Sequence, residues 1–424
     1  MNSQTIQSAY DVAKELFEEI KRDTDIQNTS KQDPEFQMVN TQKFLALESF
    51  ESLELGDNIQ KALYEEGYTK PSKIQKTVIP GIKAKVDIVV QSQSGTGKTL
   101  AFVIGILTQI EEGKGVQAVI LSPTRELNMQ IYNEICKVTR YTNIKTFLAL
   151  RDKQADKLNQ EIVLGSPGSI LNLCTRRQLD NRNIKIFVLD ETDMLLEKTT
   201  MGSQTFRLLK AFEGAQKVFI SATYNDEIKK TISAYAPECS ELYEAKNAKP
   251  DEIKLYHLDI YHKERIRALK SLFELLTVGQ VIVFVSRKAT IKKLEQILID
   301  DSNSVGILHG DLTLEERDEV VRDFKSSTTK ILICTDVFSR GMDIPQVNLI
   351  INYDLPYVEK VFNSETYIHR IGRAGRFGKT GFVIDMITGQ KELEDYLEVQ
   401  HQLGTVSKRF TLEELESVNL NETG

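Results

Sequence analysis

The chain has 424 residues, of which 41% are hydrophobic and 27% charged, proportions that are typical of globular proteins and exclude a fibrous or low-complexity polypeptide. At about 150 residues per domain, this length predicts two or three folded units. The net charge is −7, but the acidic excess lies in residues 1–40 and 411–424, so that residues 41–410 carry +1. Net charge therefore neither requires nor excludes binding to nucleic acid.

Four cysteines are scattered along the chain without a Cys-x-x-Cys pair, which predicts reduced core thiols rather than disulfides or zinc ligands. They are Cys136, Cys174, Cys239 and Cys334. No run approaches ~20 apolar residues, and the N-terminus lacks the basic start of a signal peptide. We therefore expect a soluble intracellular protein without a membrane span.

The first 40 residues are expected to lie outside the folded body. Residues 9–22 predict an amphipathic helix with a Ser8-x-x-Asp11 cap, and residues 23–40 predict a polar linker. Because an isolated helix of this length is marginal in water, a docked extension is expected, with a regulatory segment as the alternative. The folded body is expected to begin near residues 44–50.

Two runs of short apolar strands alternating with helical stretches follow. Their continuous hydrophobicity predicts strands buried on both faces, and hence two parallel α/β sheets covered by helices. In the first run the predicted strands are residues 88–90, 118–121, 146–150, 162–164, 184–189 and 218–220. After a charged break at residues 244–252 they are residues 281–285, 306–308, 331–333, 349–351 and 382–387. Two such sheets joined by a short linker predict a ligand cleft between them.

The sequence QSQSGTGKT, at residues 91–99, joins the first of these strands to a helix-like run. Gly95 and Gly97 suit a tight turn that points backbone N–H groups inward, Lys98 supplies a charge for the β and γ phosphates, and Thr99 offers a hydroxyl to Mg²⁺. Ser92 stands where the first glycine of this pattern is usual. Alone, the pattern also fits an ordinary turn.

The run IKIFVLDETD ends a buried strand in carboxylates, at the sheet edge where open α/β sheets bind ligands. We assign Asp190 to Mg²⁺, which it would hold through water, and Glu191 to orienting and deprotonating the attacking water. An acidic strand end is equally compatible with a helix cap. Together with Lys98 and Thr99 upstream, however, it predicts a nucleoside triphosphatase.

The second half contains YIHRIGRAGRFG, in which Arg370, Arg373 and Arg376 recur at three-residue intervals. Such arginines can project from a helix start, and their guanidinium groups suit phosphoryl oxygens. A solvated basic turn is the alternative. A phosphate loop in one domain and these arginines in the other predict an arginine finger that acts when the domains close.

The ordered motifs together resemble the DEAD-box RNA helicase family over residues 48–390. The motifs are Gly67-Tyr68-x-x-Pro71-x-x-Ile74-Gln75, the phosphate loop, PTREL (123–127), DETD (190–193), SAT (221–223), TDVFSRGMD (335–343) and HRIGRAGR (369–376). The resemblance implies an ATP-dependent RNA helicase with two tandem RecA-like domains, at residues 41–244 and 253–424. Residues 245–252 would be the linker and residues 1–40 an acidic N-terminal helical extension.

The resemblance also implies roles for single residues. Gln75 would read the adenine edge, which selects ATP over GTP, with Phe50 or Tyr68 as the aromatic contact. The other nucleotide contacts would be Ser94, Gly95, Thr96, Gly97, Lys98, Thr99, Gly341, Asp343, Arg373 and Arg376, and the coupling residues Asp193, Ser221, Thr223 and His369. RNA contacts, made to the backbone rather than to base sequence, would be Pro123, Thr124, Arg125, Ser166, Pro167, Gly168, Gly310, Asp311 and Thr335.

Several positions depart from the family pattern, and most of them fall on the expected RNA surface. Thr192 replaces an alanine, Ser169 an arginine, Leu314 a glutamine and Ala374 a threonine, and residues 148–153 lack the usual glycine pair. We expect ATPase activity to survive the extra hydroxyl of Thr192, because the neighbouring carboxylates are kept.

A finer resemblance is to the subgroup that acts in mRNA export at the cytoplasmic face of the nuclear pore. It lies in PSKIQ, QSQSGTGKT, ILHGDLTLEERD (307–318) and the long insert YVEKVFNSET (357–366). It implies a monomer of cytoplasm and nucleus, a nucleoporin on the first domain, an inositol-hexakisphosphate-dependent activator on the second, and an inhibitory N-terminal helix. The alternatives are a translation-initiation-type helicase and a slow-turnover, nucleotide-gated RNA clamp.

Overall fold

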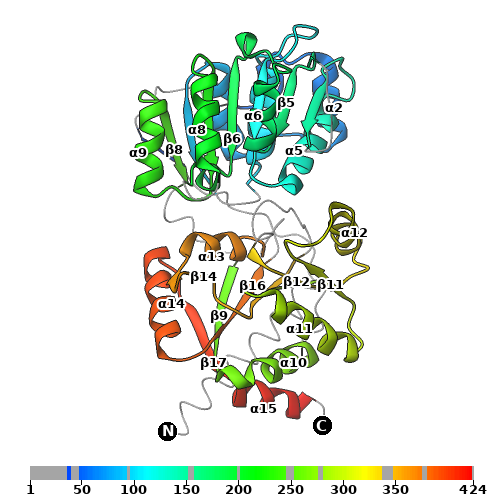
Figure 1. Ribbon diagram of the computed structural model, residues 1–424, viewed down its shortest axis with the longest axis vertical. Coiled ribbons are helices and arrows are strands. Elements are labelled where there is room, and N and C mark those ends of the chain that lie inside the picture. The colour runs from blue at the N-terminus through cyan, green and yellow to red at the C-terminus, as the bar shows by residue number, and fades with distance from the viewer. Residues whose placement is uncertain are drawn as a thin grey trace. The chain divides into compact units, whose positions relative to one another are not determined.

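The computed structural model describes residues 36–39, 47–92, 96–150, 157–197, 201–244, 253–275, 280–336, 347–374 and 380–422. The chain divides into a first unit, Asp33–Ala248, and a second unit within Lys249–Gly424 (Figure 1). Each unit has its own sheet and its own buried core. The extension helix predicted at residues 9–22 and the linker predicted at residues 245–252 lie outside the described residues.

The first unit is built on an eight-stranded sheet of order β1-β8-β2-β7-β6-β3-β5-β4, parallel except for the β1–β8 pair. The strands are β1 (Phe36–Val39), β2 (Ile88–Gln91), β3 (Ala118–Leu121), β4 (Thr146–Ala149), β5 (Ile162–Gly165), β6 (Ile186–Asp190), β7 (Gln216–Ser221) and β8 (Ser240–Glu244). The central strands are buried on both faces because their runs are wholly apolar.

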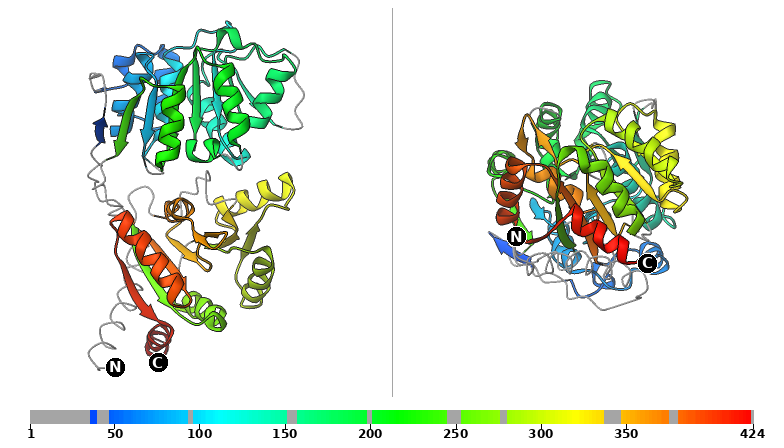
Figure 2. Two further views of the ribbon diagram at one scale, coloured as in Figure 1. Left: turned by 60° about the vertical axis from the view of Figure 1, so that its left-hand side comes forward. Right: turned by 90° about the horizontal axis from the view of Figure 1, so that it is seen from below.

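Helices cover both faces of this sheet (Figure 2). They are α2 (Asp57–Glu65), α3 (Lys73–Lys83), α4 (Lys98–Leu107), α5 (Arg125–Val138), α6 (Pro167–Thr175), α7 (Thr192–Leu196), α8 (Gly202–Ala211) and α9 (Asp226–Tyr235). Ile88 and Val90 pack in one cluster with α3, α4 and α5, whereas Val89 packs in the other with α8 and α9. The period-2 alternation of side chains along a strand produces this division.

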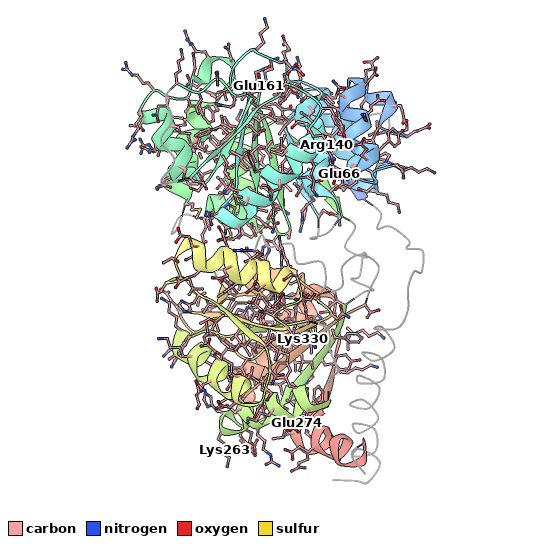
Figure 3. All side chains as sticks on the ribbon, turned by 90° about the vertical axis from the view of Figure 1, so that its right-hand side faces the viewer. Glu66, Arg140, Glu161, Lys263, Glu274 and Lys330 are labelled. Atoms are coloured by element: carbon pink, nitrogen blue, oxygen red, sulfur yellow. The ribbon has the colours of Figure 1, made fainter. Side chains whose placement is uncertain are left out.

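Two close contacts fix the helices around the phosphate loop. Gly105 lets α4 approach α3, because a Cβ there would come within 2.7 Å of the Ile82 side chain. The residues flanking α2 and α5 are joined by an ion pair between Glu66 and Arg140, both labelled in Figure 3. Helix α4, which follows the phosphate loop, is therefore packed tightly against α3, and α2 is tied to α5.

The second unit has a seven-stranded parallel sheet of order β11-β12-β10-β13-β16-β9-β17. The strands are β9 (Ile253–Asp259), β10 (Val281–Phe284), β11 (Val305–Leu308), β12 (Ile331–Cys334), β13 (Leu349–Asn352), β16 (Gly381–Ile387) and β17 (Ser407–Thr411). The helices are α10 (Arg265–Leu275), α11 (Lys288–Asp300), α12 (Leu314–Lys325), α13 (Ser364–Ile371), α14 (Gln390–Leu403) and α15 (Leu412–Glu422). One face carries α10, α11 and α15, and the other carries α12, α13 and α14.

The predicted fold of two parallel sheets flanked by helices is confirmed, and every predicted strand is present within two residues of its expected ends. The polar linker predicted for residues 23–40 is wrong at its end, because Phe36–Val39 forms β1 and pairs antiparallel with β8. Strands β8, β9 and β17 were not predicted. The insert at residues 357–366 contains a hairpin, β14 (Tyr357–Val358) and β15 (Val361–Phe362), whose two turn residues both have positive φ.

The cysteine prediction holds in part. All four thiols are free, and Cys239 and Cys334 are buried. Cys136, expected in the core, is instead exposed on α5. Among the described helices, none is long and apolar enough to cross a membrane.

Candidate nucleotide and RNA site

The phosphate loop leads into α4 through a glycine that no other residue could replace without strain. Gly97 caps α4 with φ 93°, in the left-handed region. A Cβ at this position would also lie 2.7 Å from Gln75 Nε2. The described part of the loop is therefore shaped by both backbone conformation and close packing.

The polar side chains of the loop bind one another and the backbone. Ser92 Oγ and Thr96 Oγ1 are 2.9 Å apart, and Lys98 Nζ donates a hydrogen bond to the Ser92 carbonyl oxygen. Thr99 lies in the first turn of α4, half-buried. Ser92, which replaces the usual glycine, is thus buried and bonded within the loop rather than exposed as a polar defect.

Gln75 lies beside this loop with both ends of its amide engaged. Its Oε1 accepts from the Ser72 backbone N at 2.9 Å, and its Nε2 donates to the Gly97 carbonyl oxygen at 3.3 Å. Ser72 Oγ donates to the Thr96 carbonyl oxygen at 3.1 Å. Reading an adenine edge would require the Gln75 amide to share or exchange these bonds, so its role in base selection stays a prediction.

The two candidates for the aromatic contact differ in accessibility. Phe50 is 3% exposed and belongs to the core. Tyr68 is half-buried, and its hydroxyl donates to Glu134 Oε1 at 2.7 Å; burial, and then this hydrogen bond, raise the pKa of the phenol. Of the two rings, Tyr68 presents more surface to a ligand.

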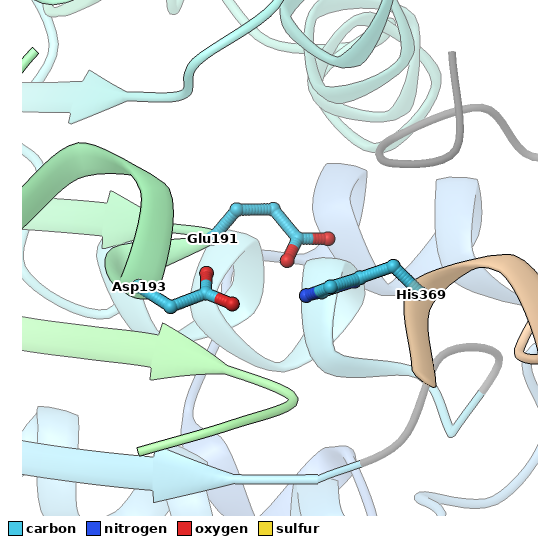
Figure 4. A group of neighbouring side chains, drawn as sticks. All are labelled: Glu191, Asp193 and His369. Carbon is cyan, nitrogen blue, oxygen red and sulfur yellow. The ribbon is translucent and has the colours of Figure 1, made fainter. Parts of the chain in front are cut away.

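Asp190 and Glu191 stand at the end of β6, where Figure 4 draws Glu191 and Asp193 as sticks. Burial raises the pKa of Asp190 to about 7, and the adjacent negative charge of Glu191 adds to that effect. The positive charge of Lys98 acts in the opposite direction. Glu191 is a non-glycine residue in the left-handed conformation, with φ 55° and ψ 54°. A strained backbone thus sets the direction of its side chain.

The unusual hydroxyl of Thr192 is bonded on both sides. Its Oγ1 donates to the Leu189 carbonyl oxygen at 2.9 Å and accepts from the Ile220 backbone N at 3.0 Å. The side chain is fully buried between β6 and β7. Thr192 therefore ties the ends of β6 and β7 together.

Thr192→Ala is accordingly expected to lower the free energy of unfolding by about 1–3 kcal/mol, because the buried Ile220 N–H loses its partner. ATP turnover should remain within about twofold of the parent value, since no reacting group changes. Urea unfolding and steady-state ATPase assays check the two expectations. Thr231→Ala on the surface of α9, which removes a hydroxyl bonded to the Glu227 carbonyl oxygen, is the matched control. A large loss of turnover without loss of stability would contradict this account.

The DETD and SAT motifs meet directly. Thr223 Oγ1 donates to Asp193 Oδ2 at 2.8 Å, and the Thr223 backbone N donates to Ser221 Oγ at 3.2 Å. The strand before the phosphate loop joins the same group, since the Ser92 N donates to the Ser221 carbonyl oxygen at 3.1 Å. Three motifs from separate parts of the chain thus form one hydrogen-bonded edge. That this edge couples nucleotide to RNA remains a prediction.

The expected RNA residues of the first unit lie on the same edge, after β3 and β5. Thr124 caps α5 and Ser166 caps α6, each accepting a hydrogen bond from a backbone N three residues on. Ser169, which replaces an arginine, is 3.0 Å from Ser166 through the two hydroxyls. Both helices therefore begin at this edge, and a helix N-terminus attracts phosphate oxygens.

In the second unit the expected RNA residues also follow strand ends. Thr335 comes directly after β12, and Gly310 and Asp311 follow β11. Lys288 forms an ion pair with Asp311 at 2.5 Å, which holds the pKa of that exposed carboxyl below its usual range. Arg317 Nη2 donates to the Gly310 carbonyl oxygen at 2.7 Å. A lysine and an arginine therefore accompany these two loop residues.

Helix α13 carries His369 and Arg370, and Arg373 follows its last turn. His369 is 1% exposed, and its carbonyl oxygen accepts a hydrogen bond from Arg373 Nε at 3.2 Å. Arg370 is fully buried and bonds Asp336, Asn352 and Asp354. The expectation that Arg370 projects from a helix start is therefore wrong, because it lies near the end of α13 and anchors that helix.

Five predicted site residues lie outside the described residues, and their roles stay predictions. They are Ser94, Gly95, Gly341, Asp343 and Arg376. Sequence reasoning missed two partners of Arg370, the buried Asn352 and the partly exposed Asp336. A signal was available for Asn352, because a polar residue ends an otherwise apolar strand.

Comparison with known proteins decides the family. A DEAD/DEAH box helicase profile matches residues 72–231, and a helicase conserved C-terminal domain profile matches residues 264–378. The ATP-dependent RNA helicase dbp5 of Schizosaccharomyces pombe is 35% identical over 388 residues, which span 89% of this chain and 77% of that protein. The chain belongs to the DEAD-box family of ATP-dependent RNA helicases.

Solved structures agree with this DEAD-box assignment. S. cerevisiae Dbp5 bound to RNA and ADP BeF3 is similar with a TM-score of 0.82 and 34% identity, covering 88% of this chain and 98% of that one. A variant of S. cerevisiae Dbp5 bound to Gle1 and IP6 is similar with a TM-score of 0.75 and 33% identity, covering 89% and 98%. These relatives confirm the family and the subgroup that the motifs predicted.

Proposed function

We propose that this DEAD-box protein is an RNA-stimulated ATPase that remodels RNA–protein complexes during mRNA export at the nuclear pore. The observation that carries the enzymatic part is the lateral strand order of the first sheet. The phosphate loop and the SAT, DETD, PTREL and SPGS (166–169) motifs lie at the ends of β2, β7, β6, β3 and β5, which are consecutive neighbours. The motifs assigned to the nucleotide and the motifs assigned to RNA therefore lie along one edge of the first sheet, on strands that are hydrogen-bonded to one another.

In this proposal different residues of this edge bind the nucleotide and the RNA. Lys98 and Gly97 hold the phosphates, Glu191 takes the proton from the attacking water, and Arg373 of the second unit neutralises charge on the γ phosphate in the ATP-bound state. The N-termini of α5 and α6 hold the RNA backbone. The coupling between nucleotide binding and RNA binding passes through Asp193, Thr223 and Ser221.

The residues present also fit a magnesium ion. A threonine hydroxyl and a buried carboxylate are oxygen donors of the kind that Mg²⁺ accepts, and burial together with the charge of Glu191 raises the pKa of Asp190, which a cation would offset. We assign Thr99 and, through water, Asp190 to this ion. When bound, it would neutralise charge on the β and γ phosphates.

The partners follow from the relatives. S. cerevisiae Dbp5 has been solved bound to RNA, to Gle1 with IP6, and to Nup159. We propose RNA, a nucleoporin and an IP6-dependent activator as partners of this chain, with the cytoplasmic face of the nuclear pore as its place of action.

Steady-state ATPase measurements on the full chain, with and without single-stranded RNA, test the enzymatic part. We expect turnover to rise at least about tenfold with RNA. Equal rates with and without RNA would overturn it. Further stimulation by an IP6-loaded activator supports the export role, whereas stimulation only by a translation-initiation scaffold would replace it with the translation alternative.

A further inference from the structure

A row of polar residues crosses the buried sheet of the second unit, close to the carboxyl ends of its strands. The register places Asn352 of β13 beside Asp385 of β16, and Asp385 beside His257 of β9. Asn352 and Asp385 are fully buried, among strands that are otherwise apolar. Buried polar groups in proteins are nearly always hydrogen-bonded, so each residue in this row is expected to have hydrogen-bond partners.

Both carboxylate oxygens of Asp385 are bonded. Tyr367 Oη donates to Oδ2 at 2.7 Å, and Asn352 Nδ2 donates to Oδ1 at 2.7 Å. The Tyr367 hydroxyl in turn accepts from Gln400 Nε2 of α14 at 3.1 Å. Asp385 therefore links β16 to β13, to α13 and, through Tyr367, to α14.

The Asn352 amide extends this link to a second residue of α13. Its Oδ1 accepts from Arg370 Nη1 at 3.0 Å, while its Nδ2 donates to Asp385. A cation, an amide and a carboxylate thus stand in line within the core. Tyr367 and Arg370 are three residues apart and so lie one turn apart on α13. Asp385 holds both of them, one directly and one through Asn352.

Arg373 follows one turn later and is held by the same helix, through its hydrogen bond to the His369 carbonyl oxygen. Figure 1 shows α13 near the end of β16, where this row lies. A shift or rotation of α13 would therefore move Arg373 with it. Misplacement of a charged group by about 1 Å can reduce turnover by about a hundredfold.

We propose that Asp385 is a positioning residue for ATP hydrolysis, which holds α13 through Tyr367 and Arg370 and thereby aims Arg373. The inference rests on the proposed function, in which Arg373 acts on the γ phosphate. Asp385 touches no nucleotide in this account, so its effect passes entirely through the helix.

The buried carboxylate of Asp385 lowers the stability of the folded unit, which favours a functional role for this residue over a purely structural one. Burial raises the pKa of Asp385 to about 6, although bonds from Tyr367 and Asn352 and the charge of Arg370 act against that rise. The folded unit therefore binds this proton more readily than the unfolded chain, and the carboxylate costs stability above pH 6. An amide in its place would remove that cost.

The other titratable groups around Asp385 do not provide this anchor. Tyr396 of α14 faces Asp385 and has a pKa raised by burial. His257 of β9 bonds Ser407 through Nδ1 at 2.8 Å, and burial lowers its pKa to about 4, so it is neutral near pH 7. The positive charge of Arg409 beside it also lowers that pKa, whereas Asp259 raises it. At neutral pH, Arg370 is therefore the cation aligned with Asp385.

The test compares Asp385→Asn and Asp385→Ala in the full chain, measuring kcat and KM for ATP with saturating RNA, and the melting temperature, all at pH 7.5. We expect Asp385→Asn to lower kcat by about three- to tenfold with KM within about twofold. Its melting temperature should stay closer to that of the parent than the melting temperature of Asp385→Ala does, because the amide keeps one acceptor oxygen and the packing. Asp385→Ala should lower kcat more than tenfold.

Two comparisons separate positioning from general destabilisation. Gln280 is 2% exposed and lies just before β10, at the amino-terminal ends of the strands. It donates to the Phe324 and Thr329 carbonyl oxygens. Gln280→Ala should lower the melting temperature while leaving kcat unchanged. Tyr367→Phe combined with Asp385→Ala should lower kcat no further than Asp385→Ala alone, because both remove the same anchor.

A normal kcat in Asp385→Asn and Asp385→Ala, or an equal loss of kcat in Gln280→Ala, would overturn the positioning role while leaving the proposed function intact. A parent protein without RNA-stimulated ATPase activity would overturn the proposed function and the inference together.

Discussion

Glu191→Gln is expected to reduce steady-state ATP turnover by about a hundredfold or more, while ATP still binds. Glu191 is 8% exposed and follows Asp190 at the end of β6. An amide of the same shape keeps the packing and tolerates the left-handed backbone, but it cannot take a proton from water. The affinity for ATP should hold, because Lys98 and Gly97 are unchanged.

Single-turnover and steady-state ATPase assays, together with binding of a fluorescent ATP analogue, check this expectation. Glu213→Gln, which neutralises an exposed acid beyond α8, is the control for a change in net charge and should turn over normally. Normal turnover in Glu191→Gln would contradict the assignment of the base. Loss of ATP binding would instead assign Glu191 to holding the nucleotide.

The central strands and the motifs at their ends could be predicted because burial on both faces demands continuous hydrophobic runs, and such runs are visible in one sequence. The edge strands β1 and β17, and β8 next to β1, carry polar residues and resemble linkers or loops in sequence. Only pairing with a partner strand far along the chain defines them. The hairpin β14–β15 was not predicted for a different reason, because its turn residues are Glu359 and Lys360 rather than the usual asparagine and glycine.

The contents of the site were predictable as residue types but not as contacts. Thr192 was expected to add polarity, yet its two bonds to Leu189 and Ile220 depend on the spacing of β6 and β7. Arg370 was expected to project outward, yet Asn352 and Asp336 hold it in the core. Long-range partners of this kind are fixed by tertiary packing, and motif spacing carries no information about them.

The strand order adds something that no motif states. From β2 to β5, each step along the edge of the first sheet passes between hydrogen-bonded neighbours. The Ser92 N–H bonds the Ser221 carbonyl oxygen, and Thr223 bonds Asp193. A change at the phosphate loop can therefore reach DETD through two hydrogen bonds, without movement of the sheet. Coupling between ATP and RNA in the first unit stays a prediction, and this short path is the route that we propose for it.

The largest expected effect in the second unit is that of Arg373→Ala, which should lower RNA-stimulated turnover by about a thousandfold or more. Arg373 is 4% exposed, and its guanidinium bonds the His369 carbonyl oxygen through Nε. Its removal leaves the phosphate loop of the first unit unchanged, so KM for ATP should stay within about threefold. Arg373→Lys should recover little, because an ammonium cannot present the two parallel donors of a guanidinium fork to phosphoryl oxygens.

ATPase kinetics with saturating RNA, and the melting temperature of each variant, separate chemistry from folding. Arg267→Ala is the control, because Arg267 is an exposed arginine of α10 paired with Glu416 and such pairs contribute less than about 1 kcal/mol. Normal turnover in Arg373→Ala would contradict the arginine-finger assignment. It would also overturn the positioning role of Asp385, because that role depends on Arg373 acting on the γ phosphate. The assignment of Arg373 does not depend on Asp385.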